Sequence, residues 1–573
     1  MQITYETKQF GGLRLKRLVL NMAGAFVGVV AAGVAQAGTI DVGNPDVKMS
    51  WDNTVKYSAG WRVANPDNAV AGDPGPGTMQ RNVNDGDNNF KKGSMITNRL
   101  DLLSEFDFRF KNAYGFRVSG AAWYDDVYNH TNDNNGTAYV NSTSVPYNQF
   151  TSATRKQAQN AEFRDAFVYG NFTPADMNVN VKGGQFTQLY GETLFFGYNG
   201  IAAAQTPLDL VRALSVPNSQ FKEIALPVKQ LSTQIQITPN LTVGAYYQFE
   251  WKKNRIPAAG SYFSFTDFAD AGGESIVFPG GGPNVALHRG QDLKAKDSGQ
   301  GGAQVKFKLG DSEFGLYAAQ FHDKMPQFYA RPGQNAQGML ASGVVDVGDY
   351  ALVYGEKIKT YGASISTLVG ETNVAAELSI RKNMPMVARG VLVNLAQVAN
   401  FGADGAGNPA YPVGDSLHFN LSAISVLGAT PLWHGASFIG EFAYNQRMRI
   451  TKNADQLDPN ATKTASAIQF VFQPEYFQVL PGLDLQVPIG VGYGINGHSS
   501  VAGVSALMPS ERGGNFSIGI KGEYQKTWQT SLNYTKYFGP KDAVIDQQFP
   551  PALSYKNFHG DRDFISLSVQ RTF

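Results

Sequence analysis

The sequence predicts an all-β fold, a transmembrane antiparallel β-barrel of about 18 strands, with about 16 as the alternative count. Three observations predict it. Apolar and polar residues alternate along most of the chain, short and long connections between the alternating stretches follow one another in turn, and an export signal at the N-terminus is followed by no apolar run long enough for a spanning helix.

The alternation is clearest in residues 231–252. Apolar residues take every second position on both sides of a Pro239-Asn240 turn, and the apolar face ends in Tyr247, Phe249 and Trp251. A period of two predicts paired antiparallel strands, and aromatic residues at the end of an apolar face are typical of a barrel at the membrane boundary. From this stretch alone, a half-buried hairpin of a soluble sandwich is an equal alternative.

The same pattern extends over the chain, beginning with a strand at residues 47–63. Residues 100–110 and 114–124 alternate around a tight Lys111-Asn112-Ala113 turn. Further short turns are expected near Pro174, Pro239, Gly310, Gly370, Pro431, Pro481 and Gln525. Long loops are expected at residues 65–92, 125–161, 189–228, 254–301, 325–354, 384–414, 451–464, 497–513 and 539–560. A barrel of about 18 strands is too wide for side chains to fill as a dry core, so the apolar faces are expected to point outward.

Composition excludes several classes of protein. The formal net charge is +1 and charged residues make up 17%, so no basic surface indicates nucleic-acid binding. The chain has no cysteine, which removes thiol catalysis, disulfides and thiolate metal sites. The 62 glycines and 12% aromatic residues fit many tight turns and aromatic girdles.

Residues 1–37 are expected to be a signal peptide, and residues 38–573 the barrel. Basic residues precede an apolar core at residues 23–34, and Ala35 and Ala37 are the small residues that a signal peptidase requires before Gly38. The apolar core has about a dozen residues, fewer than the roughly twenty that a spanning helix needs.

The C-terminal stretch ends in Phe573, after alternating apolar residues from Phe564 onward. A terminal aromatic residue resembles the signal by which bacterial outer-membrane proteins are recognised by the barrel assembly machinery. We therefore expect a location in the outer membrane of a gram-negative bacterium, in contact with its lipid.

Six short stretches resemble the domain-of-unknown-function family 1302 of proteobacterial outer-membrane proteins. They are Asn88-Asn89-Phe90 to Asn98-Arg99-Leu100, Tyr190-Gly191-Glu192-Thr193, Pro207-Leu208-Asp209, Phe221-Lys222-Glu223 to Leu226-Pro227-Val228, Tyr247-Gln248-Phe249-Glu250-Trp251 and Gly260-Ser261-Tyr262-Phe263. The chain departs from the family pattern at Gln185-Phe186 and Tyr190, where relatives carry an Arg-Gln pair and a Trp.

The resemblance implies a conduit for hydrophobic or lipid-like small molecules. Members of the family tend to be encoded near a periplasmic carrier and an inner-membrane permease of the resistance-nodulation-division superfamily, which would be the partners. The alternatives are a surface adhesin or receptor with the barrel as anchor and, with less support, an outer-membrane hydrolase. The state of the lumen distinguishes the conduit from the adhesin or receptor. An open, water-filled passage lined by Gln234, Gln236 and Gln248 favours transport, whereas a fully plugged barrel favours anchoring.

No catalytic, cofactor or metal site is predicted. The sequence has no Gly-x-Ser-x-Gly motif, and its seven histidines stand singly: His130, His288, His322, His418, His434, His498 and His559. Asp85, Asp87 and Asn89 have the alternate oxygen spacing of a calcium loop, but Phe90 replaces the expected glycine. We interpret them, and residues 133–135, as polar loop.

The most informative loop is 189–228, which mixes apolar and charged residues. Its apolar side chains must be buried, so we expect it to fold into the lumen as a plug or constriction, with a short helix at residues 208–214. Its charges could pair with one another across the segment, and Phe195 and Phe196 would cover an apolar strip. The residues expected at the constriction are Tyr190, Glu192, Asp209, Arg212, Lys222 and Glu223. Packing over the rim for stability alone is the alternative.

The mature protein is predicted to begin at Gly38, because Ala35 and Ala37 are the only suitably small pair after the apolar core. Intact-mass measurement on outer-membrane material checks this. A mature chain that retains Met1 would contradict the export argument.

Overall fold

A computed structural model describes residues 38–72, 79–135, 144–215, 224–278, 285–339, 344–389, 392–503, 507–546 and 552–573. The predicted signal peptide, with Ala35 and Ala37, lies outside these ranges. Among the described residues, no helix is both long and apolar enough to cross a bilayer.

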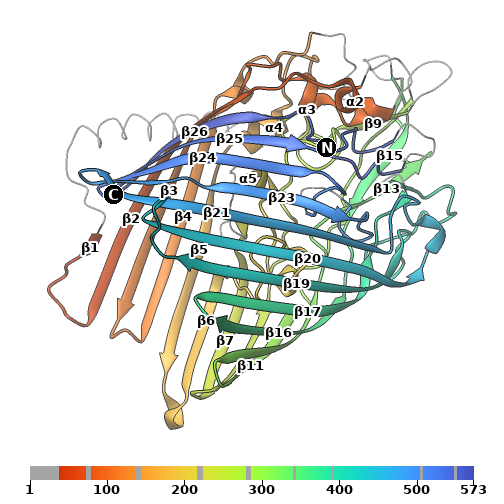
Figure 1. Cartoon of the computed structure of the whole chain (residues 1–573). Helices are drawn as coiled ribbons and strands as arrows, with labels where there is room; N and C mark the ends of the chain where they lie inside the picture. The colour runs from red at the N-terminus through yellow and green to blue at the C-terminus, as the bar shows by residue number, and fades with distance from the viewer. Residues whose placement is uncertain are drawn as a thin grey trace, which may run out of the picture.

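The described strands form a closed antiparallel barrel of 18 strands (Figure 1). In order these are β2 (Val47–Arg62), β3 (Met95–Phe110), β4 (Tyr114–Asp125), β5 (Gln159–Phe172), β6 (Asn178–Phe186), β7 (Val228–Thr238), β8 (Leu241–Gln248), β11 (Gln300–Leu309), β12 (Ser312–Phe321), β16 (Ile358–Val369), β17 (Thr372–Pro385), β19 (Val413–Leu427), β20 (Gly435–Lys452), β21 (Thr464–Leu480), β22 (Leu483–Gln486) with β23 (Ile489–Asn496), β24 (Gly514–Tyr524), β25 (Trp528–Phe538) and β26 (Phe564–Thr572). The predicted fold class and strand number are confirmed.

Two details explain this count. β22 and β23 both lie between β21 and β24, and they are one strand interrupted beside Pro488, which has no N–H to donate to the ladder. The short β1 (Gly38–Ile40) pairs with the start of β2 and is not counted as a separate strand of the barrel.

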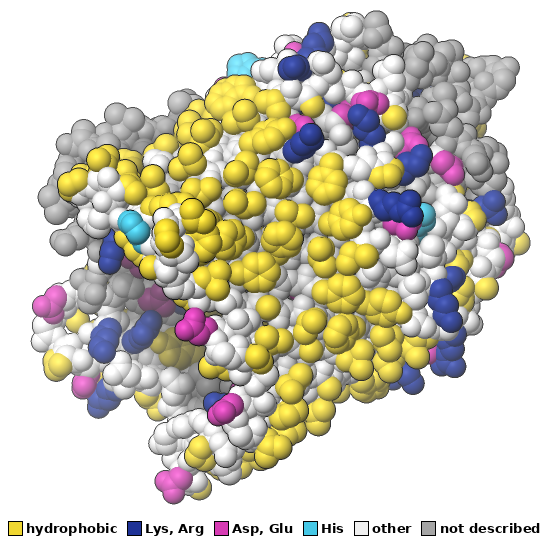
Figure 2. Space-filling view, viewed as in Figure 1, with side chains coloured by type: hydrophobic (Ala, Val, Ile, Leu, Met, Phe, Trp, Pro, Cys, Tyr) yellow, Lys and Arg dark blue, Asp and Glu magenta, His cyan; other side chains and the backbone are white. Residues whose placement is uncertain are grey.

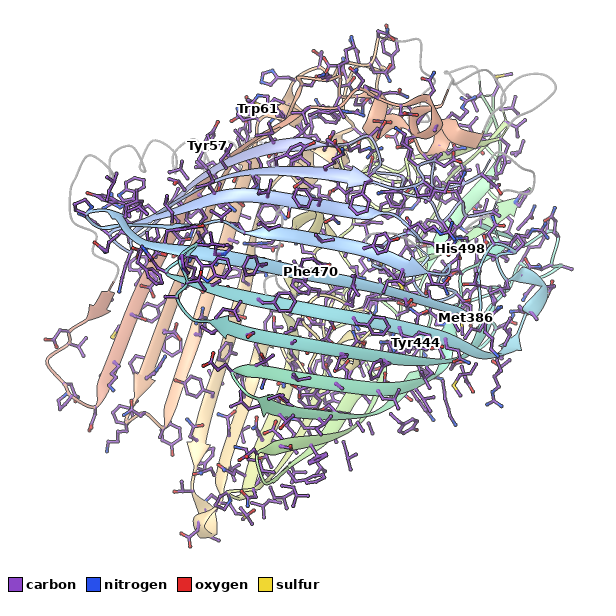
Figure 3. The ribbon with its side chains drawn as sticks, viewed as in Figure 1. Tyr57, Trp61, Met386, Tyr444, Phe470 and His498 are labelled. Atoms are coloured by element: carbon purple, nitrogen blue, oxygen red, sulfur yellow. The ribbon has the colours of Figure 1, made fainter. Side chains whose placement is uncertain are left out.

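Apolar side chains face outward, as predicted. On the β7–β8 hairpin, Leu231 and Phe249 are 47% and 58% exposed, whereas Gln230 and Gln248 on the inner face are each 1% exposed. Figure 2 shows apolar side chains over the middle of the barrel wall and charged side chains towards its two ends. Tyr57 and Phe470 lie on this wall in Figure 3. An apolar outer band with a polar interior is the pattern of a transmembrane barrel.

The connections at one end are tight turns, at the predicted places. Lys111 and Asn112 between β3 and β4 have φ values of 52° and 53°, and Gly310 between β11 and β12 has a φ of 60°. These left-handed conformations suit glycine and asparagine. The long loops gather at the opposite end, which confirms the predicted alternation (Figure 1).

The long loops contain a second sheet that the sequence did not predict. Its strands are β9 (Ser275–Phe278), β10 (Val285–Arg289), β13 (Gln327–Pro332), β14 (Gly338–Met339), β15 (Val345–Val353) and β18 (Leu392–Asn394). Two of its pairings, β10 with β15 and β13 with β18, are parallel. They join loops that are distant in the sequence, so alternation within each short stretch gave no signal for them.

The helices are short, and most lie in the long loops. They are α2 (Asn68–Ala71), η1 (Met79–Asn82), α3 (Asp85–Asn88), η2 (Val127–Asn129), α4 (Ser152–Ala158), η3 (Pro174–Asp176), η4 (Ile201–Ala204), α5 (Leu210–Ser215) and η6 (Ala454–Gln456). α5 matches the helix predicted at residues 208–214. It starts two residues later because Leu208 forms a β-bridge with Ala225.

The main hydrophobic core of the protein lies in these loops. Phe196, Tyr350, Leu352, Met386 and Leu553 are each at most 3% exposed and belong to one cluster. Figure 3 shows Met386 at the loop end of the barrel. The loops therefore form a packed dome over that end, because their apolar side chains have no lipid to face.

A buried ion cluster joins the dome to the wall. Arg62, the last residue of β2, contacts Asp87 at 2.6 Å and Asp561 at 3.2 Å, and its side chain is fully buried. It also donates to the carbonyl oxygen of Phe90 at 2.8 Å. Buried charges persist only when paired and hydrogen-bonded, so this cluster holds the loops that follow β2 and β25 against the end of β2.

The seam between β2 and β26 closes the barrel, and Phe573 completes it. Its backbone N–H donates to the carbonyl of Asn53 at 2.8 Å, and its carbonyl accepts from the Asn53 N–H at 3.0 Å. Its ring lies 4.5 Å from the guanidinium carbon of Arg571.

Deleting Phe573 is predicted to lower the amount of protein in the outer membrane and to raise periplasmic degradation. Phe573→Ala separates the two roles of the residue, because it keeps both backbone bonds to Asn53 and removes only the ring. Immunoblots of fractionated cells measure the outcome. Loss with both variants indicates an aromatic assembly signal, loss with the deletion alone indicates the seam, and unchanged levels with both would contradict the prediction.

Candidate functional site

The loop between β6 and β7 crosses the interior of the barrel. Four strands lie between β7 and β17 around the wall, and six lie between β7 and β20. Residues 192–201 of the loop nevertheless bond to inward-facing side chains of β17, β19 and β20. We call residues 189–201 the crossing segment.

Glu441 of β20 binds the middle of the crossing segment. One carboxylate oxygen accepts the backbone N–H groups of Leu194, Phe195 and Phe196, and the other accepts from the side-chain amide of Asn420 at 2.7 Å. Three consecutive N–H groups converging on one anion form a compact anion site. The carboxylate thereby satisfies backbone donors that the lumen wall would otherwise leave unpaired.

Glu377 of β17 closes the segment into a loop. It accepts the backbone N–H groups of Glu192 at 2.6 Å and Ile201 at 2.8 Å, together with the hydroxyl of Thr193 at 2.8 Å. A Cβ at Gly200 would lie 1.8 Å from the Thr193 hydroxyl oxygen and 2.5 Å from Glu377. Only glycine therefore allows the chain to turn this closely around the carboxylate.

The carbonyl groups of the segment are held from the same wall. Arg381 of β17 donates to the carbonyl oxygens of Asn199 at 3.0 Å and Gly200 at 2.8 Å. The side-chain oxygen of Asn199 lies 3.0 Å from Nδ1 of His418 and 3.2 Å from the amide nitrogen of Asn445. Donors and acceptors on three strands thus match the backbone and side-chain polar groups of one short stretch.

Sequence reasoning did not identify Glu377, Arg381, His418 or Glu441. Each occupies a polar position in an alternating strand, which the sequence shows only as facing inward. A solvated lumen residue and a tethering residue have the same pattern, so no local signal separates them.

Tyr190 and Glu192 occupy the interior, at the start of the crossing segment. Tyr190 packs against Tyr246 of β8 and Tyr317 of β12, with ring centroids 5.3 Å and 6.1 Å apart. Glu192 lies 3.4 Å from the amine of Lys306 on β11. Their effect on conduction stays a prediction.

The other predicted constriction residues lie further along the loop. Asp209 is bound by Arg255 at 2.7 Å, and Arg255 also reaches Glu162 on β5. The side chain of Arg212 is exposed. Lys222 and Glu223 lie outside the described residues. The described partners of Glu192 and Asp209 lie outside the segment: they are the inward-facing Lys306 and the loop residue Arg255.

The wall opposite the tethers carries hydrated charges. Arg117 of β4 contacts Asp107 at 3.1 Å and Asp165 at 3.5 Å, and it also pairs with Glu105. The Arg117 side chain is 32% exposed. Unlike Glu377 and Glu441, this inward-facing cluster on β3, β4 and β5 is exposed to solvent.

Above the crossing segment, the loops enclose an apolar cavity of about 80 Å³. Its lining comes from six loops and includes Tyr198, Phe265, Phe328, Val501, Leu507 and Leu553. Met325, Pro326 and Gln327 also line it and are only half-buried, so the cavity reaches the surface there.

A buried polar pair lies next to this cavity. The hydroxyl of Tyr198 donates to Asp323 at 3.2 Å, and the indole N–H of Trp251 donates to the Asp323 carbonyl at 3.1 Å. Burial raises the pKa of Asp323 and lowers the pKa of the neighbouring Lys324 to about 7. The Lys324 amine donates to the Ala203 carbonyl at 3.1 Å, which links the pair to the end of the crossing segment.

Phe195 and Phe196 were expected to cover an apolar strip for cargo. Phe196 is 3% exposed within the loop core, and Phe195 packs against that core from its edge. Neither lines the cavity. No group of three or more His, Cys, Asp or Glu side chains among the described residues is arranged to hold a metal ion.

Loosening the crossing segment is predicted to raise ion conductance. In Glu441→Gln an amide nitrogen can replace the oxygen that accepts three N–H groups, and each unsatisfied buried donor costs about 1–3 kcal/mol. Replacing residues 193–200 by a short Gly-Ser linker should raise single-channel conductance in planar bilayers several-fold, with Glu441→Gln in between.

Glu523→Gln is the matched control, because Glu523 also faces inward but lies on β24 near the tight turns. If the folded linker variant conducts like the parent protein, the segment does not limit passage.

Several solved structures of bacterial proteins resemble the chain along most of its length. No curated protein matches the chain. Solved structures with a similar fold include OccAB1 of Acinetobacter baumannii (10% identity, 94% of this chain and 99% of that chain covered, TM-score 0.41), OpdK of Pseudomonas aeruginosa with vanillate (11%, 92% and 98%, 0.39) and OmpF of Salmonella typhi in complex with daunomycin (8%, 94% and 100%, 0.37). Similarity at this level says nothing about the cargo of this chain. The sequence model described as "Protein of unknown function (DUF1302)" matches residues 18–573, and the chain therefore belongs to that family.

Proposed function

We propose that the protein is an outer-membrane channel of a gram-negative bacterium that admits an apolar or amphipathic small molecule. The observation that carries this proposal is the apolar cavity in the loop dome, directly beyond the crossing segment. A dome that served only as a lid would gain stability by filling this space, because apolar cavities are destabilising.

The lining of the cavity suits a largely apolar guest. Aromatic and aliphatic side chains predominate, and the half-buried rim at Met325, Pro326 and Gln327 provides an entrance. Binding pockets commonly combine such a lining with a few polar groups that orient the ligand. Tyr198 would be that group here, since its ring lines the cavity and its hydroxyl belongs to the Asp323 pair.

From the cavity, the route inward would pass the crossing segment and follow the solvent-exposed charges of β3 to β5. The lumen glutamines show how the segment divides the interior. Gln248 is buried and donates to the carbonyl of Gln205, whereas Gln234 is exposed and Gln236 is half-buried. The interior is thus covered on the loop side and accessible towards the tight turns.

The proposed partners come from the family resemblance. A periplasmic carrier at the tight-turn end would receive or deliver the molecule, and an inner-membrane permease of the resistance-nodulation-division superfamily would drive its movement. Insertion would depend on the barrel assembly machinery and the surrounding outer-membrane lipid.

A surface adhesin or receptor is the second candidate, and one observation favours it. The dome has its own six-stranded sheet and a hydrophobic core, so it is a folded surface in its own right. An adhesin would use the outer face of the dome and would not need the cavity. Substitutions inside the cavity therefore separate the two functions.

Met325→Trp is predicted to weaken binding of an environment-sensitive apolar dye, such as N-phenyl-1-naphthylamine, because the larger ring fills the cavity entrance. Dye titration of the purified protein in detergent measures the apparent Kd, which should rise several-fold. Met339→Trp is the matched control, since Met339 is 67% exposed on β14 and does not line the cavity. Equal dye binding by the parent protein and both variants would remove the support for a channel entrance and favour the adhesin.

A further inference from the structure

A second, smaller cavity lies between three loops of the dome. It measures about 20 Å³ and is lined by Asp85 and Asn89 from the loop after β2, by residues 146–151 from the loop after β4, and by Gly260 and Asp267 from the loop after β8. A space of about 10–15 Å³ holds one water-sized particle, so this cavity accommodates a single small ligand.

Three oxygens that belong to residues lining this cavity lack a hydrogen-bond partner among the described protein groups. They are Oδ1 of Asp85, Oδ1 of Asp267 and Oδ1 of Asn89. These residues are 7%, 1% and 4% exposed. Buried polar atoms are almost always bonded in native proteins, so three unsatisfied acceptors around one small space indicate a ligand that accepts electron pairs.

The orientation of each group is determined by its other contacts. The amide nitrogen of Asn89 donates to the carbonyl of Gly260 at 2.9 Å, which assigns the free position to the amide oxygen. Oδ2 of Asp267 accepts the backbone N–H of Asp85 at 3.0 Å, and the backbone N–H groups of Asn84 and Gly260 also approach this carboxyl group. Oδ1 makes no hydrogen bond of ordinary geometry. The three acceptors are therefore preorganised by the fold.

The two carboxyl groups are buried close to each other. Burial and the nearby charge of Asp267 raise the pKa of Asp85, and burial raises the pKa of Asp267 to about 7. The nearby cations are Arg81, which acts on Asp85, and Arg562, which acts on Asp267. The guanidinium of Arg562 donates hydrogen bonds to the carbonyl oxygens of Tyr262 and Ser264, both at 2.6 Å. A bound divalent cation would balance the negative charge of both carboxylates.

We propose that this cavity binds a divalent cation of the calcium type through the carboxylates of Asp85 and Asp267 and the amide oxygen of Asn89. All three ligands are hard oxygen donors, and no histidine lines the cavity, which favours Ca²⁺ over zinc. Backbone carbonyls or water would supply the further ligands that Ca²⁺ requires.

The site differs from the calcium loop that the spacing of Asp85, Asp87 and Asn89 suggests. Asp87 is fully buried against Arg62 at 2.6 Å and is not a lining residue. Asp267, which lies 182 residues from Asp85, takes its place. A cation bound here would connect the loops after β2 and β8, so it would stabilise the dome independently of any transported molecule.

Terbium luminescence tests the proposal on the full-length protein, refolded in detergent without lipopolysaccharide and treated with EDTA. Tb³⁺ takes calcium sites, and tyrosine excitation sensitises its emission; Tyr147 lines the cavity. We expect saturable emission that added Ca²⁺ displaces, and a higher Tm with Ca²⁺ than with EDTA.

Asp267→Asn and Asn89→Ala should each abolish the Ca²⁺-displaceable emission and the Ca²⁺-dependent rise in Tm. A cooperative melting transition in EDTA shows that Asp267→Asn folds. Asp311→Asn, in the exposed turn between β11 and β12, is the control and should respond like the parent protein. Failure of the parent protein to gain stability from Ca²⁺, or equal emission from Asp267→Asn, would overturn the proposal.

Discussion

Lipid offers no hydrogen bonds, so every backbone group in the spanning wall must pair with a neighbouring strand. The pairing of β2 with β26, completed by Phe573 and Asn53, satisfies this requirement for the first and last strands of the barrel. Closure with 18 strands then creates an interior that wall side chains alone cannot fill. The crossing segment and the loop dome are consequences of that width.

The crossing segment shows how a polypeptide can enter such an interior without leaving its own backbone unpaired. Glu377 and Glu441 accept five of its backbone N–H groups, and Arg381 donates to two of its carbonyls. Carboxylates and guanidinium groups suit this task because charge-assisted bonds are stronger than neutral ones. The cost is the burial of ionised side chains, which is tolerated only while each bond is made. These bonds should consequently hold the crossing segment in one position within the lumen.

The protein has two separate groups of apolar side chains, which lie in different surroundings. The outer belt of the barrel, with residues such as Leu231 and Phe249, faces lipid, whereas the loop core around Phe196, Tyr350 and Leu352 is packed against itself. Residues between these groups, including Arg62 and Asp561, are charged and buried, and they join the dome to the wall. The apolar cavity of the dome is therefore separate from the lipid-facing belt.

The sequence by itself determined the wall and the direction in which its side chains point. Alternation is a local property with a period of two, so Leu231 and Tyr247 could be assigned to one face and Gln234 and Gln248 to the other before any contact was known. Tight turns such as Lys111-Asn112 were equally local, and the apolar content of residues 189–228 was enough to predict that they are buried. The short helix α5 followed from the same local pattern.

Only the tertiary structure decided which side chains meet inside the barrel and the dome. Glu377 and Glu441 lie 176 and 245 positions from the nearest segment residues that they bind, Ile201 and Phe196. Asp85 and Asp267, and the parallel pairing of β10 with β15, likewise join distant parts of the chain. These contacts depend on the register and curvature of the closed wall and on the path of each loop across its end. The interior is shaped by all strands together. A local pattern in one sequence therefore cannot show which residues this far apart come into contact.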